Sequence, residues 1–174
     1  PTLIDYTVID TYNEIKNDIR TFLFIDYILE IVAKLPNDIN HKRVYEFLLR
    51  ILDHARNNID PFLLTIIFQI KILGLFGVKP ILDSCVTCGD KNITGFSVLQ
   101  GGSICSKCLK SNDYDINVYK MWNTIYYFND STNDFSIFSE YNLNLIFDTI
   151  NQYYSIHVPI TIKGLKSLII NKLN

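Results

Sequence analysis

The sequence predicts a mainly α fold, in which a single helical domain is interrupted by a small β-rich insert. Apolar residues recur at helical spacing through most of residues 1–84 and again through residues 113–174. Between them, residues 85–112 are rich in small and turn-forming residues and contain all four cysteines. A chain of 174 residues with 48% hydrophobic residues can bury one sizeable core, which argues against a disordered chain.

Two helices are expected before the first internal proline. Residues 6–20 carry apolar side chains close to helical spacing, and residues 21–35 follow with a second apolar series. The Pro36-Asn37-Asp38 stretch ends the second helix, because these residues favour turns and proline cannot continue a helix.

The next two helices have clear start signals. Asn40 is placed to cap a helix with one apolar stripe. Asp60 and Pro61 combine a capping carboxylate with a proline at the first helical position. The helix that follows, residues 61–76, is apolar nearly all round and is therefore predicted to lie at the centre of the fold.

The remaining elements are predicted from alternating apolar and polar residues and from apolar residues that recur again at helical spacing. Residues 93–99 alternate between apolar and polar before a Gly-Gly pair at 101–102, which predicts a strand leading into a tight turn. Asp115 is placed to cap the next helix, and residues 141–154 form another amphipathic one. A last short helix is expected near residues 163–173.

The cysteines form the most specific motif of the chain. Cys85 and Cys88 make one Cys-x-x-Cys knuckle, and Cys105 and Cys108 make a second. Two such knuckles bring four sulfurs to one point, which is the arrangement that binds Zn²⁺ tetrahedrally in zinc ribbons. Four thiolates leave no coordination position open, so one structural zinc ion is predicted. Two disulfides or an unmetallated remnant are the alternatives.

The charge balance and the absence of other motifs exclude several classes of function. The chain has 16 basic and 18 acidic residues, a net charge of -2, which excludes a strongly cationic, non-specific nucleic-acid binder. Residues 62–78 are too short and too polar for a membrane span, and no secretory signal is visible, so a cytoplasmic location is expected. Neither a nucleophile–base pairing nor a phosphate-binding loop is present, so neither an enzyme nor a small-molecule substrate is expected.

Two features leave room for direct contact with nucleic acid. An aromatic cluster allows base stacking, although residues at this helical spacing are more often core. Its members are Tyr119, Trp122, Tyr126, Tyr127 and Phe128. The insert carries a small basic excess, so a zinc ribbon that contacts DNA directly is the second hypothesis. The basic candidates are Lys91, Lys107, Lys110 and, in the tail, Lys163.

These features together resemble the RecO proteins of bacterial recombinational DNA repair, specifically the part that follows their N-terminal OB-fold. Residues 68–77 (FQIKILGLFG) are similar to the leucine-rich helix that ends just before the family's zinc ribbon, and Cys85-x-x-Cys88 follows after a short gap. Residues 27–30 (YILE) and residues 153–160, a Tyr-Tyr followed by Pro-Ile, are similar to two further segments of the family. An OB-fold is therefore expected to precede residue 1.

The resemblance implies a mediator of homologous recombination in the DNA damage response that has no enzymatic activity and is associated with the nucleoid. Proteins of this family bind single-stranded DNA, here expected mainly through the OB-fold, and anneal complementary strands. They act with RecR to help RecA replace single-strand-binding protein. The family's helical domain accepts the acidic, apolar C-terminal tail of single-strand-binding protein in an apolar groove.

Such a groove needs an apolar slot for the terminal aromatic residue and a cation for the terminal carboxylate. The central helix offers aliphatic side chains for the slot, although packing in the core explains the same residues. Basic residues nearby could supply the charge. The candidates are Leu63, Ile67, Ile70 and Leu73 for the slot, and Arg50, Arg56 and Lys71 for the charge.

Overall fold

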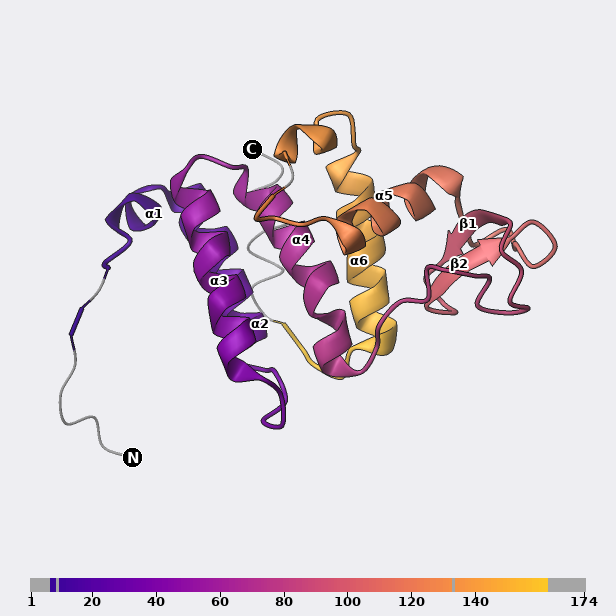
Figure 1. Ribbon diagram of the computed structural model, residues 1–174, viewed down its shortest axis with the longest axis horizontal. Helices are drawn as coiled ribbons and strands as arrows, with labels where there is room; N and C mark the ends of the chain where they lie inside the picture. Colours follow the sequence, from indigo (N-terminus) through magenta and orange to yellow (C-terminus); the bar gives the residue numbers. More distant parts are fainter. Residues whose placement is uncertain (1–6, 9, 133, 163–174) are drawn as a thin grey trace.

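The computed structural model describes residues 7, 8, 10–132 and 134–162 and confirms a mainly α fold with a small antiparallel sheet at one end (Figure 1). Among the described residues, none of the helices has both the length and the apolar character that crossing a bilayer requires. The helices are α1 (Asn13–Asn17), α2 (Ile19–Val32), α3 (His41–Arg56), α4 (Pro61–Ile72), η1 (Leu73–Phe76), α5 (Ile116–Tyr127), η2 (Phe135–Phe138) and α6 (Leu143–His157). The strands are β1 (Ile93–Ser97), β2 (Gly102–Cys105) and β3 (Tyr114–Asp115).

The first predicted helix is wrong in extent. Instead of spanning residues 6–20, it is limited to the five residues of α1, and α2 begins immediately after Asp18. Asp18 has an extended backbone, and its carboxylate accepts hydrogen bonds from the backbone N–H groups of Arg20 and Thr21. Because an aspartate that caps a new helix adopts a non-helical conformation, the predicted helix is interrupted at Asp18.

The central position of α4 is confirmed. The Asp60 carboxylate accepts from the backbone N–H of Phe62, and Pro61 occupies the first helical position as expected. Helix α4 packs against α2, α3, α5 and α6, and it continues into η1 before Gly77 ends it (Figure 1). Gly77 has a φ of 75°, a left-handed conformation that favours glycine.

The two C-terminal helices begin at capping side chains, of which Asp115 was expected and Asn142 was not. Asp115 caps α5 through the backbone N–H groups of Asn117 and Val118, and Asn142 caps α6 through that of Leu145. The helix predicted from residue 141 is therefore confirmed, and it extends to His157. The short helix predicted near residues 163–173 lies outside the described residues.

The sheet shares its core with the helices. Its strand order is β2-β1-β3, with antiparallel neighbours. From β1, the fully buried Phe96 stacks on Trp122 of α5, with ring centroids 4.6 Å apart. Trp122 also packs on Tyr153 of α6, and its indole N–H donates to the Thr149 hydroxyl at 2.9 Å. Trp122 is therefore a core residue and not a surface for stacking bases.

Candidate functional site

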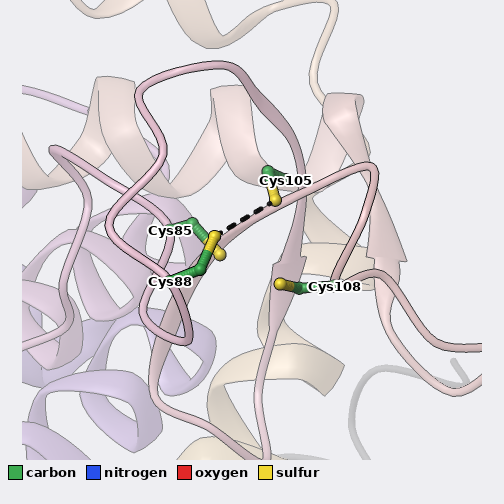
Figure 2. A group of neighbouring side chains, drawn as sticks. All are labelled: Cys85, Cys88, Cys105 and Cys108. Carbon is green, nitrogen blue, oxygen red and sulfur yellow. Dashed lines mark hydrogen bonds between the residues drawn. The ribbon is translucent and has the colours of Figure 1, made fainter.

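Two tight turns present the cysteine sulfurs to one another. In the first turn, the backbone N–H of Cys85 donates to the Asp90 carbonyl at 2.7 Å, and Gly89 N–H donates to the Cys85 carbonyl at 2.8 Å. Gly89 has a φ of 79°, which only glycine adopts readily. In the second turn, the N–H of Cys108 donates to the Cys105 carbonyl at 3.0 Å. Both turns hold their backbone so that the side chains converge (Figure 2).

The sulfur cluster has the size and the donor set of a tetrahedral metal centre. All four sulfurs lie within 4.8 Å of one another, and those of Cys88 and Cys105 are 3.6 Å apart (Figure 2). Zinc–sulfur bonds of about 2.3 Å in a tetrahedron place sulfurs roughly 3.8 Å apart. A disulfide would require about 2.05 Å, and all four cysteines are free. The four sulfurs predicted as metal ligands are therefore brought together, and they can hold a metal ion.

One side of this cluster is packed and the other faces solvent. Cys85 and Cys105 are buried and, together with Ile104 of β2, form a small apolar cluster separate from the main core. Cys88 is exposed, and Cys108 is half-buried. A metal bound here would join the two turns to β2, which suits a structural role.

Hydrogen bonds within the cluster shift the pKa values of two of its thiols in opposite directions. Burial acts to raise the pKa of the Cys85 thiol, but hydrogen bonds from backbone N–H groups, including those of Cys105 and Cys88, outweigh burial and lower this pKa to about 6. Sharing a proton with the Cys88 sulfur, together with burial, raises the pKa of Cys108 to about 12. A divalent cation would stabilise the deprotonated form of all four sulfurs and would displace the remaining protons.

Metal affinity is therefore expected to rise with pH. Between about pH 6.5 and about pH 7.5, the apparent affinity should increase by about tenfold for each proton that metal binding releases. Competition with a chromophoric chelator at the two pH values measures this change. An affinity that does not vary with pH would contradict the assignment of four thiolate ligands.

The lysines predicted for nucleic-acid contact lie on the surface of the ribbon. Lys91, Lys107 and Lys110 are exposed, and the Lys91 ammonium donates to the Asp83 carbonyl at 3.3 Å. Lys163 lies outside the described residues. A DNA contact through these side chains stays a prediction.

The aliphatic side chains predicted to form the slot are core residues. Leu63 is 6% exposed, and Ile67, Ile70 and Leu73 are fully buried. Because α4 is surrounded by four other helices, its apolar faces are covered by the fold itself. These side chains offer no open slot at the surface. They pack in the core of the helical domain.

A pocket of about 430 Å³ lies beside this core, between α3, the end of α4 and the end of α5. It contains Arg50 and Lys71, two of the three cations predicted for carboxylate binding, but not Arg56. The lining residues are Phe47, Arg50, Lys71, Tyr126, Tyr127, Phe128, Asn129 and Asp130.

The half-buried side chain of Lys71, a residue of α4, reaches the C-terminal end of α5. Its ammonium donates to the backbone carbonyls of Tyr126, at 2.7 Å, and of Phe128. These carbonyls end α5, where a cation also compensates the helix dipole. Burial lowers the pKa of Lys71, and the charge of Asp130 acts in the opposite direction. Among the described residues the ammonium makes these two hydrogen bonds, so its third proton can be donated to a ligand.

Arg50 joins the aromatic wall of the pocket to a buried carboxylate. Its Nε donates to Asp130 at 2.7 Å, and its guanidinium lies over the ring of Phe47, 5.4 Å from the centroid. Phe47 stacks in turn on the buried Phe68, with centroids 5.3 Å apart. The pocket therefore combines a fixed aromatic surface with two cations and one carboxylate, a formal charge of +1. No sequence pattern distinguishes Asp130, which lies in a polar loop.

Arg56 has a different role. Its guanidinium pairs with Asp10, lies 3.9 Å from Glu14 and 4.0 Å from Asp53, and covers the ring of Tyr12 at 4.8 Å. With three carboxylates within 4.0 Å, this cation pairs the chain around α1 with α3 and lies outside the pocket that contains Arg50 and Lys71.

Comparison with known proteins supports one family. The family model described as Recombination protein O C terminal matches residues 16–166. A protein of Halalkalibacterium halodurans is 30% identical over 117 residues, which cover 65% of this chain and 45% of that protein. A protein of Bacillus cereus is 31% identical over 133 residues, which cover 73% of this chain and 54% of that protein.

Both relatives are named DNA repair protein RecO. The chain spans about half the length of the curated relatives it matches. The family model, in contrast, covers most of this chain, including every helix from α2 to α6 and all four cysteines. The chain therefore belongs to the RecO family of DNA repair proteins.

Proposed function

We propose that this chain is the part of a recombination mediator that binds the acidic, apolar C-terminal tail of single-strand-binding protein, and that it does so in the Arg50–Lys71 pocket. The observation that carries the proposal is the pocket itself. A free ammonium proton beside a fixed aromatic surface suits a ligand that ends in an aromatic residue and a carboxylate.

The role proposed for the whole protein is based on its membership of the RecO family. We propose that the protein acts with RecR to load RecA and anneal strands on the nucleoid, without enzymatic activity, and that it binds single-stranded DNA mainly through an OB-fold. Family membership and the relatives' name support DNA repair as the process. We also propose that the cysteine cluster holds one structural Zn²⁺, which the spacing and number of its thiols favour.

Replacing Lys71 by glutamine is expected to weaken binding of the tail peptide by about tenfold or more. A hydrogen bond to a charged group contributes roughly 1.5–3 kcal/mol, and glutamine keeps a donor but not the charge. Fluorescence anisotropy with a short labelled peptide, acidic and ending in an aromatic residue with a free carboxylate, measures the affinity.

Two variants serve as matched controls for this experiment. Arg56→Gln removes a cation that the N-terminal carboxylates hold, and Lys120→Gln removes an exposed one on α5. Both should bind the peptide like the unmodified chain. If the Lys71 variant folds, as judged by circular dichroism, and binds with unchanged affinity, the pocket is not the site.

A second candidate function is direct contact of the ribbon with DNA, which the exposed Lys91, Lys107 and Lys110 favour. Affinity for single-stranded DNA should then fall steeply with salt, and replacing the three lysines by glutamine should lower the slope of log affinity against log salt by about two. Binding measured by gel shift at several salt concentrations tests this. An unchanged slope in the triple variant would remove the ribbon from the DNA-binding surface.

A further inference from the structure

A half-buried histidine lies next to Asp130, the carboxylate that lines the Arg50–Lys71 pocket. His54 of α3 has its Nε2 atom 3.7 Å from a carboxylate oxygen of Asp130, and its ring packs edge-on against Phe135 at 4.8 Å. The same Asp130 oxygen accepts the hydrogen bond from Arg50. The side chain of His54 is 22% exposed, and that of Asp130, which lines the pocket, is 8% exposed.

The Nε2 atom of His54 is itself buried and has no hydrogen-bond partner among the described residues. Buried polar atoms are nearly always satisfied, so an orphaned nitrogen beside a carboxylate needs an explanation. A protonated ring carries N–H donors on both nitrogens, and a small approach would let Nε2–H donate to Asp130. The neutral ring carries its proton on only one of its two nitrogens, whereas the charged ring always presents an Nε2–H donor beside Asp130.

Several charged groups bear on this ring. Asp130 faces it from the loop after α5, and Arg50 lies one turn away on the same helix. Lys71 of α4, which also lines the pocket, interacts with Asp130 through its charge. The η2 helix contributes the aromatic ring of Phe135. Protonation of His54 would thus raise the formal charge of the group formed by Arg50, Lys71, Asp130 and His54 from +1 to +2.

We infer that His54 makes the affinity of this pocket for an anionic peptide depend on pH. When the ring is charged, it neutralises Asp130, so that Arg50 and Lys71 attract the ligand's carboxylate without competition from the carboxylate of the protein. This inference rests on the proposed function, because it concerns the same pocket and the same class of ligand. By linkage, the bound peptide in turn favours the protonated ring.

Histidine is the side chain that ordinarily changes charge between pH 5 and pH 8. The carboxylates of the peptide stay ionised throughout this range, since their pKa values lie near 4. A change of affinity in this range therefore reports on the protein and not on the peptide.

The test is a titration of the zinc-loaded chain with the labelled acidic peptide at about pH 6 and about pH 8. The unmodified chain is expected to bind roughly threefold to tenfold more tightly at the lower pH, because one more charge is added close to the pocket. His54→Gln keeps a neutral donor and should bind with nearly equal affinity at both values. Asp130→Asn should bind more tightly than the unmodified chain at pH 8 and lose most of the pH dependence.

His41→Gln is the matched control, because His41 is an exposed histidine at the start of the same helix. This variant should keep the full pH dependence, and circular dichroism establishes that each variant is folded. Absence of peptide binding at both pH values would overturn the proposed function and this inference together. Peptide binding without pH dependence, or pH dependence that survives in a folded His54→Gln variant, would overturn this inference alone.

Discussion

Cys105→Ser is expected to abolish metal binding and to lower the melting temperature of the whole chain by about 10 °C or more. Binding of a structural metal ion contributes directly to the free energy of folding. Cys105 ends β2, which pairs with β1, and β1 places Phe96 against Trp122 in the helical core. Loss of the metal should therefore weaken the packing of the helices as well as the ribbon.

Three measurements check this expectation. Elemental analysis should find about one zinc ion per unmodified chain and none in the variant. Scanning calorimetry gives the melting temperature. Trp122 is the only tryptophan of the chain, so its fluorescence reports on the boundary between sheet and helices. Its emission should change in the same transition that loosens the ribbon.

Ser106→Ala is the control for this substitution, because Ser106 is an exposed residue of the same knuckle that lies outside the sulfur cluster. It should retain the metal and the melting temperature. A metal-free chain that melts like the metal-loaded one would contradict a structural role for the metal. Loosening of the ribbon with unchanged Trp122 emission would contradict the coupling to the helical core.

Phe96→Ala is expected to destabilise the chain by about 3–5 kcal/mol, the usual cost of truncating a buried phenylalanine. Phe96 is fully buried, and its ring stacks on Trp122 with planes only 18° apart. Truncation would leave a cavity between β1 and α5, because strand pairing on both sides of β1 limits how far the sheet can collapse inward.

Urea denaturation of the metal-loaded protein measures this change in the free energy of unfolding. Leu99→Ala is the control, since Leu99 lies in the same hairpin but is 58% exposed, and its truncation should change stability by less than about 0.5 kcal/mol. A loss below about 1 kcal/mol for Phe96→Ala would mean that the sheet does not share the core of the helical domain.

The features that the sequence predicted well are local ones. Capping by Asn40, Asp60 and Asp115 depends on a side chain and on backbone N–H groups two or three residues away. The cysteine cluster joins two turns that are each defined within a few residues. The strongly apolar character of α4 indicated a central helix without reference to any neighbour. Interactions of this kind are determined by residues that lie close together in the sequence.

The features that the sequence did not predict depend on tertiary contacts. A helix that is apolar all round does not indicate which face remains open, so the fully buried Ile67 and Ile70 could not be told from slot residues. Asp130 is 80 residues from Arg50 in the sequence and lies in a loop with no distinguishing pattern. At Asp18, a capping interaction outweighed the helical periodicity on both sides.

The central claim, that the Arg50–Lys71 pocket receives the tail of single-strand-binding protein, is tested most directly by a crystal structure of the chain with the tail peptide. We predict a peptide carboxylate within hydrogen-bond distance of the Lys71 ammonium and the terminal aromatic side chain against Phe47. A peptide bound elsewhere, for example in the apolar groove lined by Tyr12, Phe22 and Leu29, would contradict the claim.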